Sequence, residues 1–369
     1  MANLFDYVDW RGDLSFEQVP LNQIDALMFA HITYAIFDGL VPEDFSKGIT
    51  LAELEPVFKA APDYERRTEV GYLINKRTTE LLFRCAESKR FKDVKICGMK
   101  SVFDEIKREQ FAAVVYTFGN TRIVSYRGTD DTLLGWEEDF NLAYLDEIPA
   151  QADALAYFKD AAAAFDGDFI IVGHSKGGNL AVNTAVRCGE ELQKRISMVY
   201  NFDGPGFPKD FFASAEYKAV EKRISSVYPE FSVVGMLFNH PKKYQIVDST
   251  EKAVMQHDAL SWQLMGADFI QKKRFSSGST IFNKGLNKWV EGLEKDQRKV
   301  FVGALFDVIN ASGVKTIEEM QKNVLPSSAR MWAAYAALDK NTKKEVRQIL
   351  GLFKESMESA LPVVKLIGR

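Results

Sequence analysis

A serine within a Gly-x-Ser-x-Gly motif is the residue of this chain best suited by type and spacing to do chemistry. The surrounding run, residues 170–181, reads IIVGHSKGGNLA, so a short β-branched stretch ends at the motif and a small-residue segment typical of a helix follows. Such a strand–turn–helix unit holds a nucleophilic hydroxyl on a sharp, strained turn. Side chains at Gly173 or Gly177 would clash with neighbouring elements. The motif predicts Ser175 as a nucleophile of acyl transfer, the alternative being a Gly-rich turn without chemistry.

A polar turn upstream could supply the hydrogen-bond donors that this reaction needs. Two strands are predicted at Phe111–Tyr116 and Arg122–Tyr126, joined by a Gly-Asn turn, and the second strand runs directly into Arg127–Thr129. A developing oxyanion is held by backbone N–H groups of the residue after the nucleophile and of a loop that follows an earlier strand. We therefore expect an oxyanion hole formed by Thr129 and Lys176, with the Lys176 side chain itself solvated.

At these residues the sequence resembles a known family. Three motifs occur in the order of the class 3 lipases, which are α/β hydrolases: YRGT at 126–129, GWEEDF at 135–140 and GHSKGG at 173–178. Three further segments are similar to a bacterial branch of largely uncharacterised lipase-3-like proteins: LFDYVDWRGDLSF at 4–16, FDGPGF at 202–207 and QHDALSW at 256–262. The resemblance covers about two thirds of the chain. It implies an α/β-hydrolase fold and a serine-hydrolase reaction, and it does not supply a substrate.

The general base that takes the serine proton must be one of four histidines. His257 follows the last predicted strand, it matches the family's histidine-containing motif, and it holds the last position in the Ser…Asp/Glu…His order of α/β hydrolases. His31 lies in an apolar segment and is expected to be a hydrogen-bonded core residue, whereas His174 adjoins the serine and should point away from it. We predict His257 as the base, with His240 as the alternative.

The triad acid is where the chain departs from the class 3 lipase pattern. The family places an aspartate after the second strand beyond the nucleophile, and the matching stretch Glu230–Gly235 has Ser232 at that point. A serine hydroxyl can orient an imidazole but cannot stabilise an imidazolium by charge.

Asp203 is the better candidate for the acid. It ends the predicted strand Ile196–Phe202, at the carboxyl edge of the sheet where active sites of open α/β sheets lie. The resemblance allows this position, because pancreatic-type lipases also carry their aspartate one strand earlier. We predict Asp203 as the acid, against a role in which it only caps the following turn. The remaining alternatives are Glu230, Asp248 and Asp258.

Composition limits the class of protein. The chain has 369 residues, of which 46% are hydrophobic and 27% charged, and a net charge of −4 gives no electrostatic basis for binding nucleic acid. Three separated cysteines without a CxxC pattern are typical of core residues in a reducing compartment. No signal-peptide pattern and no run of about 18 apolar residues occurs, so we expect a cytoplasmic protein. Neither metal-ligand spacing nor a nucleotide-binding fingerprint occurs, so no cofactor and no metal is expected.

These residues must be positioned by three regions of the chain. Residues 1–92 are predicted to be helical and packed on the core, with helical spacing at 51–60 and 70–89 and a capping-box pattern at 15–18. Residues 93–268 are predicted to form the α/β-hydrolase core, a mostly parallel sheet covered by helices. Its further strands are expected at 169–172, 196–202, 224–228 and 244–247, and its helices at 150–165 and 177–191. Residues 269–369 are predicted to be helical, with apolar stripes that pack on the sheet or on the N-terminal helices, or that form a lid or a lipid-docking face.

The sequence thus predicts a serine hydrolase that cleaves carboxylic esters of small molecules or lipids through a Ser-His-Asp triad and an acyl-enzyme. Two alternatives stay open. One is an inactive hydrolase fold that serves as a binding protein. The other is different acyl chemistry on the same triad: thioesterase, peptidase or transacylase. Contact with a membrane surface and the oligomeric state also stay open.

Overall fold

The computed structural model describes residues 2–68, 70, 74, 76–130 and 132–367, which form two compact units. Unit 1 comprises Met1–Phe103, Phe111–Asp130 and Ala150–Phe275. Unit 2 comprises Asp104–Gln110, Asp131–Pro149 and Ser276–Arg369. Unit 1 therefore joins the N-terminal residues to most of the strands, and unit 2 gathers the C-terminal helices with two segments from the middle of the chain.

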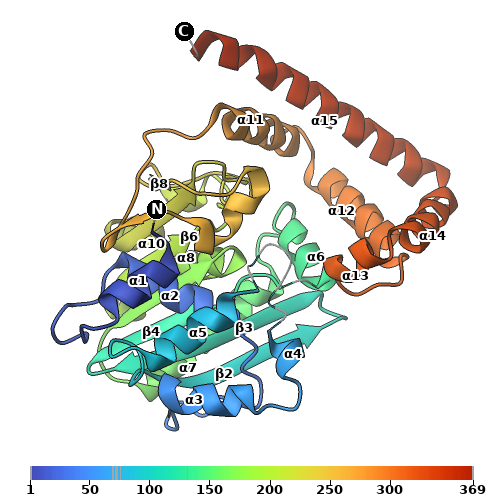
Figure 1. The fold of residues 1–369 in the computed structure, drawn as a ribbon. Coiled ribbons are helices and arrows are strands. Elements are labelled where there is room, and N and C mark those ends of the chain that lie inside the picture. Colours follow the sequence, from blue (N-terminus) through green and yellow to red (C-terminus); the bar gives the residue numbers. More distant parts are fainter. Residues whose placement is uncertain (1, 69, 71–73, 75, 131, 368–369) are drawn as a thin grey trace. The chain divides into compact units, whose positions relative to one another are not determined.

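Eight of the described strands form one sheet whose spatial order follows the chain from β1 to β8 (Figure 1). The strands are β1 (Ile49–Thr50), β2 (Lys95–Asp104), β3 (Glu109–Phe118), β4 (Thr121–Tyr126), β5 (Phe169–His174), β6 (Ile196–Phe202), β7 (Ile224–Pro229) and β8 (Gln245–Val247). From β4 to β8 all neighbours are parallel, whereas β3 and β4 form an antiparallel hairpin and β1 pairs antiparallel with β2. A short antiparallel pair, β9 (Leu264–Met265) and β10 (Asp268–Phe269), follows.

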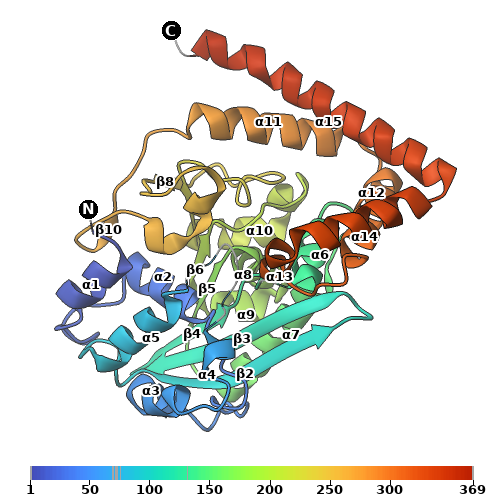
Figure 2. The same cartoon turned by 45° about the vertical axis from the view of Figure 1, so that its right-hand side comes forward.

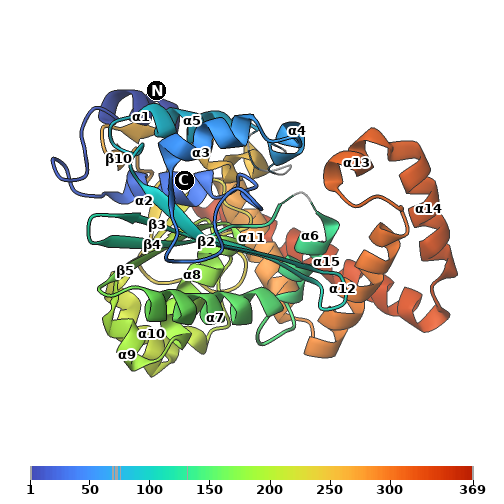
Figure 3. The same cartoon turned by 90° about the horizontal axis from the view of Figure 1, so that it is seen from below.

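Helices of unit 1 cover both faces of this sheet. Figure 3 shows α1, α2, α3 and α5 on one face and α7, α8, α9 and α10 on the other. The first group, with the short α4, is α1 (Leu4–Arg11), α2 (Gln23–Ile32), α3 (Leu51–Lys59), α4 (Tyr64–Arg67) and α5 (Thr78–Glu87). The second is α7 (Pro149–Ala164), α8 (Lys176–Arg187), α9 (Glu190–Lys194) and α10 (Ala215–Val220). The predicted α/β class, with a mostly parallel sheet covered by helices, is confirmed.

The central strand β5 is buried because α2 and α8 pack on it. Helix α2 begins at a capping box, in which Asn22 accepts from the first-turn N–H groups and Asp25 accepts from the Asn22 N–H. Every residue of α2 after its first is buried, and all of these residues except Asp25 and His31 are apolar, as expected for a core helix. Full burial of Leu27, Phe29 and Ile32 contributes about 1.5–3 kcal/mol for each side chain. This packing fixes the platform on which the strand carrying the Gly-x-Ser-x-Gly motif lies.

Local sequence signals succeed and fail for identifiable reasons. The predicted hairpin forms as β3 and β4, with Gly119 at a φ of 50° in its turn. At Ser15–Gln18 both hydrogen bonds of a capping box are present, but they close a turn and no helix follows. The helix expected at 70–89 begins at Thr78, and part of its predicted start lies outside the described residues.

Unit 2 consists of helices that bury their apolar stripes against one another. They are α6 (Leu133–Asn141), α11 (Ser277–Glu291), α12 (Lys295–Asn310), α13 (Ile317–Lys322), α14 (Val324–Ala337) and α15 (Lys340–Ile367). Figures 1 and 2 show α11 beside α15, where the Trp289 ring lies 5.3 Å from that of Phe301 and 5.2 Å from that of Phe353. The Phe140 ring on α6 lies 5.5 Å from that of Phe306 on α12. The stripes expected to pack on the sheet or the N-terminal helices thus find partners in each other.

Candidate active site

The Gly-x-Ser-x-Gly motif forms a strained elbow between β5 and α8. Ser175 has a φ of 58° and a ψ of −134°, a backbone conformation that costs about 1–3 kcal/mol for a residue with a side chain. Its N–H donates to the Phe202 carbonyl over 2.9 Å, and its carbonyl accepts from the Gly178 N–H over 2.8 Å. These bonds hold the turn to the end of β6 and to the first turn of α8.

The motif glycines are required by close backbone approach. A Cβ atom added at Gly173 would lie 2.7 Å from the Gly178 nitrogen and would overlap the Gly177 carbonyl. One added at Gly177 would overlap the carbonyl oxygen of Tyr126 at the end of β4. At both positions the added Cβ would come closer to backbone atoms than real Cβ atoms do, so the steric clash expected from the sequence is present in the fold.

The Arg127–Thr129 loop lies against the elbow. A Cβ added at Gly128 would lie 3.0 Å from the Ser175 Cβ and 2.6 Å from the His174 carbonyl oxygen, so only glycine fits there. Thr129 follows this contact point and Lys176 follows the serine, and both are buried. The loop that carries Thr129 thus passes close to Ser175 at Gly128, and Lys176 adjoins the serine in the chain. The expectation of a solvated Lys176 side chain is wrong, because that residue is only 1% exposed.

Asp203 and His257 form a buried pair. The His257 Nδ1 lies 2.6 Å from the Asp203 Oδ2, with exposures of 4% for His257 and 0% for Asp203. Asp203 directly follows β6, its φ is 50°, and its N–H donates to the Val227 carbonyl over 2.8 Å. Burial raises the pKa of the Asp203 carboxyl, and the hydrogen bond from His257 opposes that rise.

Ser232 supplies a second hydrogen bond to this carboxylate. Its hydroxyl donates to the Asp203 Oδ1 over 2.6 Å from the loop after β7, the point at which the class 3 pattern would place the acid. A Cβ added at Gly235 would overlap the same Oδ1 and lie 2.9 Å from the Ser232 Oγ. The serine at the family's acid position therefore holds a carboxylate that comes from the neighbouring strand.

The other candidate acids have different partners. Glu230 and Asp248 lie 3.6 Å and 3.2 Å from the Lys272 ammonium. The Asp258 carboxylate accepts from the Leu260 N–H over 3.1 Å and caps a 3-10 helix, η4 (Ala259–Ser261). These contacts are those of surface ion pairs and a helix cap, and Asp203 is the candidate carboxylate that lies within hydrogen-bond distance of His257.

His174 links the elbow to the segment that carries His257. Its Nε2 lies 2.8 Å from the His257 carbonyl oxygen and its Nδ1 lies 2.9 Å from the Tyr34 hydroxyl. A carbonyl oxygen can only accept, so Nε2 carries the proton and Nδ1 accepts from Tyr34. Burial lowers the pKa of His174 well below its ordinary value, which keeps the ring neutral as this pattern needs. His174 therefore points away from the serine, as expected, and its partners are specific.

The His257 segment is fixed by further buried contacts. His257 ends a 3-10 helix, η3 (Ala253–His257), and the Trp262 indole N–H donates to the Gln256 carbonyl over 2.8 Å. The Gln256 side chain accepts from the Phe231 N–H over 2.7 Å and donates to the Glu251 carbonyl over 3.0 Å. The backbone around the histidine is thus anchored on both sides.

The remaining histidines lie in other surroundings. His31 is buried on α2, its Nε2 lies 3.0 Å from the Thr78 Oγ1, and burial lowers its pKa to about 3. The His240 ring lies 5.8 Å from that of Tyr228, and burial lowers its pKa to about 4. His31 is the core residue that the sequence predicts.

Tyr34 is the site residue that the sequence does not reveal. It lies 140 positions before His174, at the end of the apolar segment that forms α2, and nothing in its spacing marks it.

No cluster of three or more His, Cys, Asp or Glu able to hold a metal occurs among the described residues. Within the same residues, no helix is both long enough and apolar enough to cross a membrane.

Comparison with known proteins gives a family and two distant structural likenesses. Residues 85–307, more than half of the chain, match the family described as Mbeg1-like. The crystal structure of M37 lipase is 12% identical, covering 58% of this chain and 69% of that chain with a TM-score of 0.37. The Rhizomucor miehei lipase propeptide complex is 16% identical, covering 62% and 68% with a TM-score of 0.33. No curated protein matches the chain. The chain belongs to the Mbeg1-like family, and its fold is a mostly parallel α/β sheet with helices on both faces.

Proposed function

We propose that this protein is a serine hydrolase that cleaves carboxylic esters through an acyl-enzyme. The observation that supports this most is the buried Asp203–His257 pair, 2.6 Å apart, on a segment that His174 ties directly to the Ser175 elbow. The strained backbone at Ser175 and the buried carboxylate–imidazole pair each lower the stability of the fold. Acyl transfer requires both features: a nucleophile held on a strained turn and a carboxylate that orients the histidine base.

In the proposed reaction, Ser175 attacks the ester carbonyl while His257 takes its proton at Nε2. The Asp203 carboxylate holds the Nδ1 proton and stabilises the imidazolium, and the Ser232 hydroxyl keeps that carboxylate in place. The histidine then gives its proton to the leaving alcohol, and water releases the acyl group by the reverse sequence.

The oxyanion is proposed to be held by backbone N–H groups of Lys176 and Thr129. The close passage of the loop supports this, since a Cβ added at Gly128 would lie only 3.0 Å from the Ser175 Cβ. One oxyanion-hole donor of this kind lowers the activation barrier by about 2.7–4 kcal/mol. Tyr34 and His174 are proposed to act through position, by holding the His257 carbonyl and hence its ring.

Fluorophosphonate labelling tests the proposal most directly. Wild-type protein should be labelled at Ser175, and Ser175→Ala should lose both labelling and hydrolysis of p-nitrophenyl esters by several orders of magnitude. Ser197→Ala, which removes an exposed serine hydroxyl on β6, is the matched control and should behave as wild type. Absence of labelling in folded wild-type protein would contradict the proposal and favour a binding role for the fold. If the wild type is active, p-nitrophenyl esters of increasing acyl length would show which chain length the pocket accepts best.

A further inference from the structure

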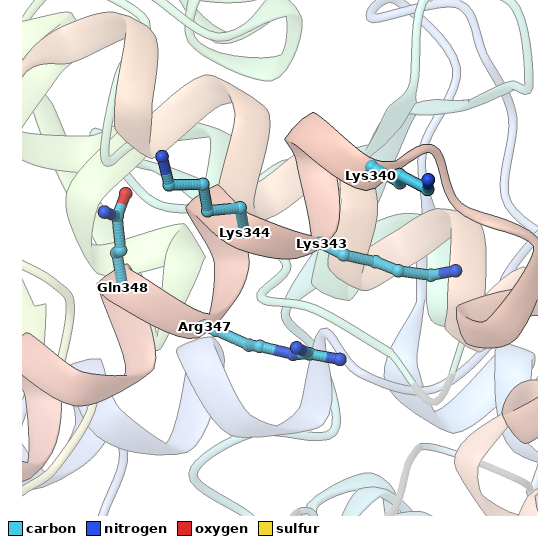
Figure 4. A pocket seen from close by; sticks show the side chains of 5 residues that line it. All are labelled: Lys340, Lys343, Lys344, Arg347 and Gln348. Carbon is cyan, nitrogen blue, oxygen red and sulfur yellow. The ribbon is translucent and has the colours of Figure 1, made fainter.

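Four cationic side chains gather at the start of α15. Together with one amide they line a cavity of about 400 Å³, shown in Figure 4: Lys340, Lys343, Lys344, Arg347 and Gln348. Their spacing of three, four, seven and eight places them on one face of the helix. The protein as a whole carries a net charge of −4, so this local excess of positive charge runs against its composition.

This positive charge does not stabilise the helix on which it lies. The N-terminal end of a helix already has a partial positive charge, so cations in the first turns are unfavourable there. Asp339, just before the helix, accepts from the Asn341 N–H over 2.8 Å and the Thr342 N–H over 3.0 Å as a helix cap. Glu345 is the one acidic residue within 340–348, so the four cations outnumber it. The cluster therefore favours an external anion.

An exposed apolar stripe on α14 continues this basic face. Four exposed residues recur at helical spacing: Leu325, Ala329, Trp332 and Ala336. The exposed fractions are 84% for Leu325 and 70% for Trp332, which is unusual for large apolar side chains. A helix face of this kind requires a partner or an apolar medium.

Measured contacts join the stripe to the cations. The Trp332 ring stacks on that of Tyr335 with centroids 5.5 Å apart and an interplanar angle of 10°. The Tyr335 hydroxyl accepts from the Arg347 Nε over 3.3 Å, and the Lys343 ammonium donates to the Ala336 carbonyl over 2.5 Å. The end of α14 and the start of α15 are thus one continuous surface, which we call the α14–α15 corner.

We propose that the α14–α15 corner docks on the surface of anionic phospholipid bilayers. Lysines and arginines attract the lipid headgroups, and the exposed Trp332 on the adjacent face enters the boundary between headgroups and acyl chains. A second copy fits less well, because a symmetric contact through this corner would bring the two cationic clusters together. The proposal concerns binding and does not depend on the proposed hydrolase activity.

Vesicle sedimentation of the full-length Ser175→Ala protein tests the proposal without interference from lipid hydrolysis. Binding to phosphatidylcholine vesicles should be weak and should rise strongly when phosphatidylserine is included. The double variant Lys340→Gln/Lys344→Gln, which spares the two hydrogen bonds at the corner, should lower the partition coefficient about thirtyfold. Trp332→Ala should lower it as well.

Controls separate this mechanism from general charge and from other occupants. Lys209→Gln/Lys222→Gln removes the same charge from two exposed lysines of unit 1 and should leave vesicle binding unchanged. Equal loss in that control, or equal binding with and without phosphatidylserine, would overturn the proposal. So would release from the vesicles by millimolar inorganic phosphate at constant ionic strength, which indicates a site for free phosphate, or a dimer in light scattering that Trp332→Ala dissolves.

Discussion

Replacement of the buried Asp203 by asparagine separates charge from shape at the proposed triad. Asparagine has the same outline and tolerates the positive φ of 50° found at this position. The Asp203 Oδ1 accepts from the Ser232 hydroxyl. The Gly235 backbone N–H also donates to this carboxylate, and Gly235 lies on the Oδ1 side. An amide NH₂ placed there would face the Gly235 donor, so the asparagine oxygen should take this side and the NH₂ should face His257.

That orientation forces the wrong tautomer on the catalytic histidine. An NH₂ group at the former Oδ2 position donates to the His257 Nδ1, 2.6 Å away in the wild type, so the ring proton moves to Nε2. Nε2 then cannot accept the proton of Ser175. The expected loss is about 10⁴ in kcat, equivalent to about 5.4 kcal/mol in the activation barrier.

Asp203→Asn should lower activity without lowering the stability of the fold. Burial raises the pKa of Asp203, so stability falls as pH rises from the ordinary aspartate pKa through the raised value in the folded state. Above that window the ionised carboxylate destabilises the fold in full, and a neutral asparagine lacks this cost. Asp203→Asn should therefore have a melting temperature equal to or above that of the wild type.

The assay is steady-state hydrolysis of a short p-nitrophenyl ester, combined with thermal unfolding followed by circular dichroism. Glu230→Gln is the matched control: it removes a carboxylate that lies 3.6 Å from Lys272, and it should cost less than tenfold in kcat. An Asp203→Asn protein that is folded and retains more than 1% of wild-type kcat would refute the tautomer argument. A greater loss in Glu230→Gln would move the acid to Glu230.

Four further perturbations, one of them with a control variant, follow from the same structure. Tyr34→Phe removes the donor to the elbow histidine, so it should lower the rate of fluorophosphonate labelling and destabilise the fold by about 1–3 kcal/mol through the unsatisfied buried nitrogen; unchanged labelling would show that this contact does not position the base. Gly128→Ala should lower kcat by at least about 10², because its Cβ would overlap the Tyr34 hydroxyl and lie 2.6 Å from the His174 carbonyl oxygen, which displaces the loop from the serine. The control Gly303→Ala, in the open face of α12, should raise stability by about 0.5–1 kcal/mol in urea unfolding. Burial lowers the pKa of His31 to about 3, so stability should be lost as pH falls from about 6.5 toward that value, and His31→Gln should reduce this slope by about 1.4 kcal/mol per pH unit. A chain ending at Phe275 should aggregate, because α6 would lose the unit 2 helices that cover its apolar side chains; a soluble, active truncation would contradict this.

Local sequence patterns were sufficient for the elbow and for most strands. Glycine at 173 is required by backbone contacts with Gly177 and Gly178 inside one strand–turn–helix unit, so the motif itself carries that information. Glycine at 177 is required by the Tyr126 carbonyl at the end of β4, a contact that only the fold provides. The hairpin of β3 and β4 follows from alternation and a Gly-Asn turn, and the position of Asp203 at the end of a predicted strand marks it as the candidate acid. The roles of Ser175, Asp203, His257, Thr129 and Lys176 in catalysis stay predictions.

Only the tertiary structure decided the contacts that join distant segments. The bonds from His174 to Tyr34 and to the His257 carbonyl span 140 and 83 positions, and no local pattern encodes them. The sequence likewise shows Ser232 as a departure from the family pattern, and only the fold brings its hydroxyl to Asp203 across neighbouring strands. Backbone conformation is fixed by near neighbours in the chain, whereas a buried polar group takes whichever partner the packing of whole elements brings within about 3 Å.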